Sequence, residues 1–539
     1  MRYDAIIIGA GMSGLAAGIR LAMFDKRVVI LERHYVWGGL NSFYQFKGRQ
    51  FDVGLHAMTN YVPRGSKGKP LTRLLKQLRL KHEQLDLYEQ SFSLISFPSA
   101  NLRFDNDFET LRGEVRRAFP RQIDGFDALT REITAFNELD LDAPQVSARE
   151  IVRRHIREPL LEDMLFCPLM FYGSAREHDM DWDQFVVMWK SIYMEGFARP
   201  QQGVRHVLSL LTNRYRELGG ELRLRAGVKR ILTREGEAVG VELDSGEIIE
   251  ADNVLSSAGL VETTKLAGGA GVPPADIRAS RPDEVGKLSF TETISVLSEP
   301  LQKHRPEADA TGKLSFTETI SVLDAPPKTD ATIIFFSNRD RFEYRCPEDL
   351  CDVDSGVICM PQNFKLPKPI DPLVRITNIA NYAKWTALER GDGSSEVLIP
   401  SEWKVSGIRS QVSGNAKAIP ETRYPIPDTS KTNTYTQAKQ NFYERSVAAV
   451  TPAHLPDFRA SVQLIDMFTP RTITHFTGHE GGAVYGSPKK SRTGETGING
   501  LTLMGTDQGF LGIIGAALSG ISMANRWVLK EGAVSEPIA

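Results

Sequence analysis

Apolar residues near the start of the chain form two short runs separated by a longer helical pattern. Residues 5–8 are all apolar, residues 12–24 repeat apolar positions at helical spacing, and residues 28–31 form a second apolar run. The glycine-rich residues 9–14 join the first run to the helical pattern. This order predicts a strand, a tight turn, a helix and a second strand, which together begin a parallel α/β sheet.

Later stretches carry patterns that suit the same sheet. Residues 204–218 have the spacing of a helix that ends at Gly219 and Gly220. Strands are predicted at residues 221–224, 228–232, 238–243 and 251–259, and a last strand near residue 501 precedes a long apolar helix at 512–529. Between these stretches, residues 66–199 are mainly helical in spacing, and residues 266–460 contain several predicted strands broken by Pro and Gly.

The whole pattern predicts an α/β fold with two interleaved domains, because 539 residues are too many for one simple core. A discontinuous Rossmann-like domain would be built from residues 1–65, 200–265 and 461–535. An α+β domain would take residues 66–199 as its helical part and residues 266–460 as its β-rich part.

One twelve-residue segment occurs twice. Residues 286–297 recur without change at 312–323, and each copy alternates like a half-buried strand. Because only one copy can occupy a given position in a sheet, we expect the other to form an edge strand or an irregular loop. A recent tandem duplication or a sequence-assembly artefact explains the identity better than a structural repeat does.

Composition narrows the class of function. The formal net charge of −2 offers no basis for nucleic-acid binding. Four cysteines are too few for a disulfide framework, and reduced thiols favour a cytoplasmic location. No run reaches the ~18–20 apolar residues of a membrane-spanning helix, so any membrane association would be peripheral. Residues 5–24 are interpreted as the first strand and helix of the mature fold, not as a signal peptide.

Metal binding is not expected. The cysteines at 346, 351 and 359 match no common zinc spacing. His475 and His479 are four residues apart, but the surrounding glycines favour a loop or strand over a metal-binding helix.

The first glycine turn has the residue types that a dinucleotide requires. Gly9 permits the tight turn, Gly11 leaves room for the pyrophosphate at a helix N-terminus, and Gly14 lets the helix pack close to the strand. Glu32, at the end of the second strand, is placed to accept hydrogen bonds from ribose hydroxyls.

A second turn lies near the end of the chain. A strand ends in Gly505-Thr506-Asp507, and a glycine-rich turn then opens the last helix. Asp507 is a candidate for binding ribityl or ribose hydroxyls, and the backbone of Gly515 is a candidate for facing the flavin. A site built from three separated segments suits FAD, which is longer than a nicotinamide dinucleotide at its flavin end.

With these motifs the chain resembles the phytoene desaturase, carotenoid isomerase and retinol saturase group of FAD-dependent oxidoreductases. The resembling residues are 9–14, Glu32, Arg33, Gly38, Gly39, 51–56, 219–231, 469–472 and 505–520. The resemblance implies FAD as cofactor. It implies cofactor contacts from Gly9, Gly11, Gly14, Glu32, Arg33, Gly38, Gly39, Val228, Gly505, Asp507 and Gly515, with the Val228 backbone near the adenine. The chain has Leu40 where many members of the group carry Arg.

The function expected from this resemblance is FAD-dependent oxidation or reduction at C–C or C=C bonds of a hydrophobic, carotenoid-type polyisoprenoid, most simply a desaturation. The tail 505–520 is closer to retinol saturases and isomerases, so a redox-neutral cis–trans isomerase or a saturase is the alternative. Two more distant alternatives for the function are a flavin amine oxidase and a non-enzymatic lipid-escort protein that resembles the Rab GDP-dissociation inhibitors.

The flavin itself would carry the chemistry, with His56 and Tyr485 as candidate side chains near it. Each has a plain structural alternative, a backbone-bonded histidine and a core tyrosine. The partner is expected to be a lipophilic small molecule, delivered at a membrane surface; the oligomeric state is left open. Apolar residues at 166–171 and 185–193 would line a substrate tunnel or form helix-packing core.

Overall fold

A five-stranded parallel sheet gathers strands from distant parts of the chain. The computed structural model describes residues 2–54, 57–137, 146–268, 314–388, 434–488 and 490–529. Within them the sheet order is β19-β13-β1-β2-β9, and all four pairings are parallel. The strands are β1 (Ala5–Ile8), β2 (Val28–Leu31), β9 (Glu221–Arg223), β13 (Val254–Ser256) and β19 (Leu501–Leu503). The prediction of a Rossmann-like sheet from three sequence segments is therefore confirmed.

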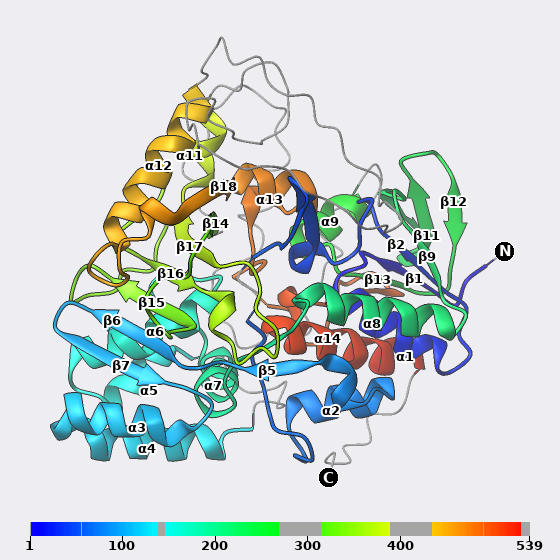
Figure 1. Cartoon of the computed structure of the whole chain (residues 1–539). Coiled ribbons are helices and arrows are strands. Elements are labelled where there is room, and N and C mark those ends of the chain that lie inside the picture. The colour runs from blue at the N-terminus through cyan, green and yellow to red at the C-terminus, as the bar shows by residue number, and fades with distance from the viewer. Residues whose placement is uncertain are drawn as a thin grey trace.

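Three helices pack side by side along one face of this sheet (Figure 1). They are α1 (Met12–Ala22), α8 (Val204–Glu217) and α14 (Gly512–Met523), and α14 runs on into a π-helical turn at Ala524–Leu529. Helix α1 is buried nearly all round, because its sequence MSGLAAGIRLA is apolar or small on most sides. Nearby lie α2 (Pro70–Leu78), α9 (Leu260–Gly268) and an antiparallel sheet of β10 (Val228–Arg234), β11 (Glu237–Leu243) and β12 (Ile248–Glu250).

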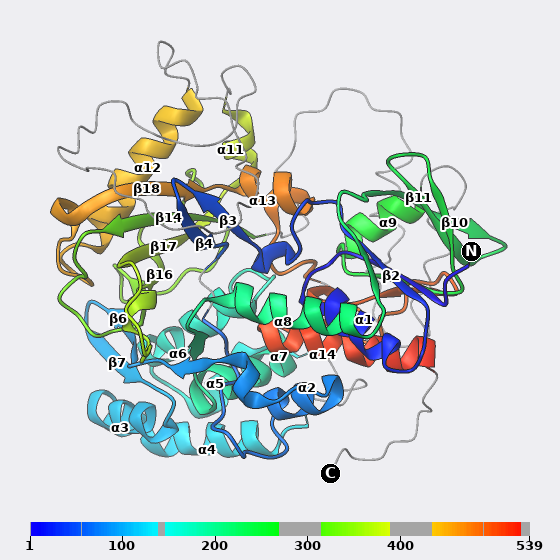
Figure 2. The same cartoon turned by 45° about the vertical axis from the view of Figure 1, so that its right-hand side comes forward.

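A second, larger sheet occupies the other half of the molecule (Figure 2). Its order is β18-β14-β17-β16-β15-β6-β7. The strands are β6 (Ser93–Phe97), β7 (Ala100–Phe104), β14 (Ser315–Leu323), β15 (Ile333–Ser337), β16 (Ser355–Cys359), β17 (Leu373–Ala380) and β18 (Val462–Phe468). Strands β6 and β7 come from the stretch predicted as mainly helical, so local spacing missed two strands there.

The second copy of the repeated segment contributes an interior strand. Strand β14 pairs with β17 on one side and β18 on the other, and all nine of its residues are buried. The first copy, residues 286–297, lies outside the described residues, so the expectation of an edge strand or loop for it stays a prediction. Strand β18 belongs to this sheet although it lies within the predicted segment 461–535. The domain limits remain a prediction.

A layer of helices covers the end of the large sheet at β6 and β7 (Figure 1). These are α3 (Phe108–Ala118), α4 (Ile123–Ala135), α5 (Ala148–His155), α6 (Pro159–Gly173) and α7 (Trp182–Trp189). The apolar residues of α6 and α7 considered as tunnel lining are buried in one cluster with strand residues, which is the core-packing alternative. Two further helices, α11 (Tyr382–Ala387) and α12 (Thr434–Val450), lie at the opposite end of the sheet.

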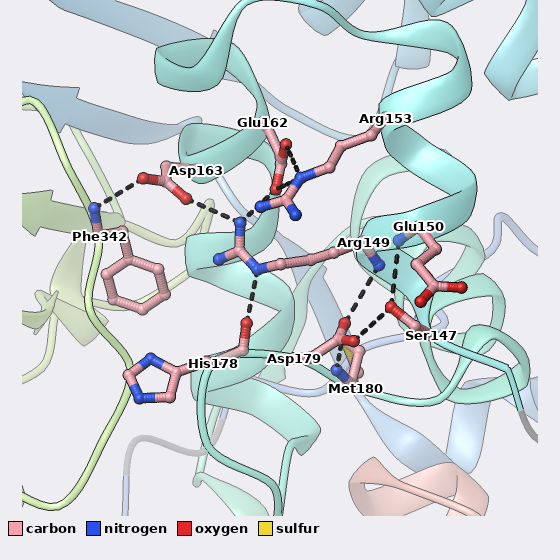
Figure 3. Close-up of polar contacts among 10 residues, drawn as sticks. All are labelled: Ser147, Arg149, Glu150, Arg153, Glu162, Asp163, His178, Asp179, Met180 and Phe342. Atoms are coloured by element: carbon pink, nitrogen blue, oxygen red, sulfur yellow. Dashed lines mark hydrogen bonds and ion pairs between the residues drawn. The ribbon is translucent and has the colours of Figure 1, made fainter.

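A buried ion-pair cluster joins α5 to α6 (Figure 3). Arg149 donates to the carboxylates of Glu162 and Asp163, at 2.5 and 2.9 Å, and lies over the ring of Phe166. Asp163 also accepts from the backbone N–H of Phe342, which lies in the β-rich part. The cluster therefore links two parts of the second domain that are far apart in sequence.

Two short pairings and one more helix complete the described elements. Strands β3 (Phe43–Phe46) and β4 (Arg49–Asp52) form a hairpin, and β5 (Leu87–Glu89) pairs with β8 (Ala198–Pro200). Helix α13 (Pro470–Thr477) contains His475, so the expectation of loop or strand there was wrong. Proline and the threonine capping box start this helix, and Gly478 at φ 77° ends it, which leaves His479 outside.

Among the described residues, no helix combines the length and hydrophobicity that a membrane crossing requires. The same residues hold no group of three or more His, Cys, Asp and Glu side chains arranged for a metal.

Candidate functional site

The first glycine turn lies at the carboxyl end of β1, where parallel sheets bind ligands. Gly9 has φ 96°, which favours glycine, and a side chain at Gly14 would collide with the Gly9 carbonyl. A side chain at Gly11 would have only the Gly38 carbonyl oxygen near it, at 4.0 Å. The turn therefore needs Gly9 and Gly14 for its own shape, whereas Gly11 leaves open space in front of α1.

The second glycine pair closes over the first. The backbone N–H of Gly38 donates to Ala10 O at 2.9 Å, and Gly38 and Gly39 have φ of 118° and 56°. A side chain at Gly39 would lie 3.8 Å from the Cα of Gly11. Two turns far apart in the sequence thus form one cradle that has no side chains.

Glu32 lies at the rim of this cradle. Its carboxylate accepts from the backbone N–H groups of Ala10 and His34, at 2.8 and 2.9 Å. Each oxygen retains a further lone pair, so the group can still accept from a hydroxyl. The neighbouring Arg33 is exposed and reaches toward Gly478, and β10 starts at Val228 nearby.

The third turn brings the end of the chain to the same place. Gly505 has φ 91°, and a side chain on it would lie 3.3 Å from the Ser13 hydroxyl in the first turn of α1. Asp507 is buried and accepts from the backbone N–H groups of Ser487 and Leu260, at 2.5 and 2.6 Å. Asp507 therefore ties three chain segments together, a role that the sequence did not indicate.

These residues fit a dinucleotide cofactor. Helices α1 and α14 begin with no side-chain cap and no acidic residue in the first turn, so their N-terminal N–H groups are available to an anion. Gly515 lies in the first turn of α14. The glycine cradle leaves the space that a pyrophosphate needs, and Glu32 lies where a ribose would follow.

A buried charge network supports the segment that leads toward the site from the hairpin β3–β4. Arg375 donates to Glu318 at 2.7 and 3.0 Å and to the backbone oxygen of Asp52 at 2.9 Å. Glu318 also accepts from the backbone of Gly54, and Asp52 pairs with Arg199 at 2.6 Å. Burial raises the pKa of Glu318, and Arg375 opposes that rise.

This network was missed by sequence reasoning because its members lie on four separate strands. Period-2 spacing puts Glu318 on a strand, but nothing local shows that Arg375 is opposite. The candidate His56, two residues beyond Gly54, lies outside the described residues.

Tyr485 and Lys490 form part of the wall between the Asp507 turn and the second domain. The Tyr485 hydroxyl donates to the backbone oxygen of Phe171, and its ring contacts Phe316 edge-on at 5.7 Å. Lys490 is buried and donates to Tyr485 O at 2.6 Å, close to Asp507. Burial lowers the pKa of Lys490 to about 8. The structure thus gives Tyr485 a packing role and adds a buried amine that the sequence analysis did not single out.

Comparison with known proteins agrees with this geometry. Residues 12–263 match the family model of the flavin containing amine oxidoreductases, which implies a flavin cofactor. The matched residues include helix α1, which follows the first glycine turn, the second glycine pair and strand β13.

The curated relatives of this chain belong to the group of proteins that its sequence motifs indicated. The chain is 26% identical to a prolycopene isomerase of Arabidopsis thaliana over 50% of each protein. It is 26% identical to a phytoene desaturase of Neurospora crassa over 56% of each. It is 23% identical to an all-trans-retinol 13,14-reductase of Danio rerio over 95% of this chain and 84% of that protein. The predicted resemblance is confirmed, although the chain spans only about half the length of the isomerase that it matches.

Solved structures show the same fold. An oxidoreductase of Methanosarcina mazei aligns with 97% of this chain and 99% of its own, with a TM-score of 0.58 and 15% identity. The predicted fold class, a Rossmann-like core with an interleaved second domain, is confirmed by this similarity and by the observed sheets.

Proposed function

We propose that this protein is an FAD-dependent oxidoreductase that acts on C–C or C=C bonds of a hydrophobic polyisoprenoid. The observation that carries the proposal is the meeting of three glycine turns, from residues 9–14, 38–39 and 505–509, at the carboxyl ends of one parallel sheet. A cradle of this shape suits a dinucleotide, and the family match, which implies a flavin, supports FAD as that dinucleotide.

The predicted contacts can be assigned to parts of FAD. Gly9, Gly11 and Gly39 line the space for the pyrophosphate, and Glu32 accepts from the adenosine ribose. Asp507 keeps lone pairs for the ribityl chain in addition to its two backbone bonds. The remaining proposed contacts are Gly14, Arg33, Gly38, Val228, Gly505 and Gly515.

Bound flavin supplies a hydride acceptor or donor at carbon. The chain's own contribution is to hold the substrate against it and to exclude water. Phe316, at the start of β14, packs with Phe171 and Tyr485 on the side of the Asp507 turn. An aromatic wall of this kind favours a lipophilic substrate over a charged one.

Reduction of a double bond is the second candidate. The retinol 13,14-reductase of Danio rerio is matched along nearly the whole chain, whereas the isomerase and the desaturase are matched along about half of it. That breadth favours a saturase over a redox-neutral isomerase. Amine oxidation and lipid escort without flavin remain the more distant alternatives.

The purified protein tests the proposal directly. We expect a yellow protein with a flavin absorption band, or an apoprotein that becomes yellow with FAD. Colourless protein that cannot be reconstituted would favour the escort alternative. Carotenoid precursors and retinol are then supplied under air and under reducing conditions. Loss of two hydrogens in the product identifies a desaturase, gain of two a saturase, and unchanged mass with altered retention an isomerase.

Location and delivery of the substrate are part of the same proposal. We place the protein in the cytoplasm with peripheral attachment to a membrane, because a polyisoprenoid partitions into lipid. Sedimentation with lipid vesicles checks the attachment, and protein that stays in the supernatant at all lipid compositions would contradict it. Hydrogen peroxide release with simple amines, but not with isoprenoids, would identify an amine oxidase instead.

A further inference from the structure

Arg205 is a partly buried cation with no direct partner in the described part of the chain. It lies in the first turn of α8, next to the N-terminal glycine Gly203. Neither a hydrogen bond nor an ion pair joins its guanidinium to any described residue. Burial lowers the pKa of Arg205, which shows that its charge is held in a poorly solvated position. A cation in such a position is costly unless an anion approaches it.

The charges around Arg205 leave one positive charge in excess. Its electrostatic neighbours are Asp52 and Arg199, and these two pair with each other at 2.6 Å. A side chain at Gly203 would collide with the Asp52 carboxylate and lie 2.8 Å from Arg199 Nη2, so the pair lies against the start of α8. The Asp52 carboxylate already pairs with Arg199, so this group holds two cations and one anion.

The helix places Arg205 on the side that faces the second glycine pair. Leu208 lies one turn further along α8. A Cβ atom added to Gly38 would lie 2.8 Å from the Cδ1 of Leu208. Residues three apart lie on the same helix face, so Arg205 and Leu208 share the stripe next to this turn. The turn itself continues into Leu40 and Asn41, which carry no charge. Arg205 is therefore a cation that the fold places on the α8 face next to the second glycine pair.

We propose that Arg205 binds the pyrophosphate of the dinucleotide held in the glycine cradle. The inference rests on the proposed function and names a cofactor-binding residue outside all the sequence motifs. A planar guanidinium can bind a phosphate through two parallel hydrogen bonds, which suits a single arginine beside a doubly charged pyrophosphate. Ligand binding would then neutralise the excess charge and complete the hydrogen bonds of the side chain.

The test measures ligand affinity of the full-length apoprotein at physiological salt. Arg205→Gln is expected to weaken binding of FAD, followed by quenching of flavin fluorescence, by about 10- to 100-fold, the loss typical of a charge-assisted bond. Binding of ADP, which carries the pyrophosphate without the flavin, should weaken by a similar factor. Riboflavin, which has no phosphate, should bind Arg205→Gln and the unmodified protein equally. Arg205→Lys should lie between the two, because it keeps the charge and loses the fork.

A matched control removes the same charge elsewhere on α8. Arg214→Gln lies six residues beyond Leu208, the residue that meets Gly38, or about 9 Å at helical rise, and this distance exceeds the screening length of about 8 Å. We expect the control to change FAD affinity by less than about twofold. Because Arg205 has no hydrogen-bond or ion-pair partner among the residues that the structure describes, Arg205→Gln should leave the unfolding temperature of the apoprotein unchanged or raise it.

Separate outcomes contradict the inference and the proposed function. Unmodified protein that binds neither FAD nor ADP would refute the proposed function. Unmodified protein that binds FAD, with Arg205→Gln binding it equally well, would refute the inference alone. An equal loss of riboflavin affinity would place Arg205 at the flavin ring, and a lower unfolding temperature of the Arg205→Gln apoprotein would make it a structural residue; both overturn the pyrophosphate contact.

Discussion

Arg375 and Glu318 form the most deeply buried ion pair that bears on the site, and separating them should be costly. The side chains are 1% and 7% exposed, so solvent screens neither charge. Arg375 donates to both carboxylate oxygens of Glu318 and to the backbone oxygen of Asp52. Arg375→Met keeps much of the side-chain volume but leaves Glu318 without its cation.

The expected loss of unfolding free energy at pH 7 is about 3–5 kcal/mol, the usual cost of stranding one partner of a buried pair. About 1 kcal/mol of this belongs to the lost bond to Asp52. The double variant Glu318→Gln with Arg375→Met removes the stranded charge. It should recover most of the lost free energy, except the part that belongs to the hydrogen bond to Asp52.

The loss should depend on pH in a defined direction. Burial already raises the pKa of Glu318, and removing Arg375 raises it further. The folded variant then binds a proton that the unfolded chain releases above about pH 4.3. Stability of Arg375→Met relative to the unmodified protein should therefore fall as pH rises above the already raised pKa of Glu318 in the unmodified protein, by at most about 1.4 kcal/mol per pH unit. Below about pH 4 the difference between the two proteins should be smallest.

Urea unfolding followed by tryptophan fluorescence, at several pH values between 4 and 8, measures this prediction. The double variant serves as the control, because position 318 cannot ionise in it; Arg375→Met should lose stability relative to the double variant as pH rises. A cost below about 1 kcal/mol at pH 7, or a cost that grows on acidification, would refute the reasoning.

Three further changes test other parts of the structure. Arg149→Met should cost about 1–3 kcal/mol in urea unfolding, because it leaves the largely buried Asp163 without its cation while Glu162 keeps Arg153; a loss under about 0.5 kcal/mol would mean that the Asp163 charge is solvated. Gly14→Val should abolish FAD binding and lower the unfolding temperature, because its side chain would strike the Gly9 carbonyl; retained binding would contradict the observed turn. The pKa of Lys490 is lowered to about 8, so the folded protein loses that proton before the unfolded chain does. The free energy of unfolding of Lys490→Met, relative to that of the unmodified protein, should therefore be highest below pH 8. This difference should shrink as the pH rises toward 10. Chemical unfolding across that range measures it, and a constant difference would contradict a buried, charged amine.

Local sequence patterns were sufficient for the nucleotide-binding strands. The runs at β1 and β2 are short and wholly apolar, and helices α8 and α14 begin where the pattern predicted. These elements could be predicted because both faces of a parallel sheet are covered, so residues at every position of such a strand are apolar. The glycines between them could be predicted because a side chain would be strained at Gly9 and would collide with the backbone at Gly14.

The β-rich half was less predictable. Strands β6 and β7 lie in a stretch with helical patterns on both sides, and β6 joins its sheet by pairing with β15, about 240 residues later. Alternation over five residues is too short a signal to outweigh those neighbours. Helix α13 was misjudged because the three glycines at 478, 481 and 482 were interpreted as part of the same irregular segment, whereas Gly478 ends a capped helix.

The sequence by itself determined which residues can surround a dinucleotide, because the requirement for glycine at a tight turn and for a carboxylate after the second strand is local. It also indicated that the site must be discontinuous. Only the tertiary structure decided which charges meet. Asp507 accepts from the backbones of Ser487 and Leu260, Arg375 pairs with Glu318, and Arg205 has no hydrogen-bond or ion-pair partner within the described part of the chain. The reason is physical: a hydrogen bond or ion pair depends on distances of a few ångströms in space, and residues that lie hundreds of positions apart leave no local trace of such a contact.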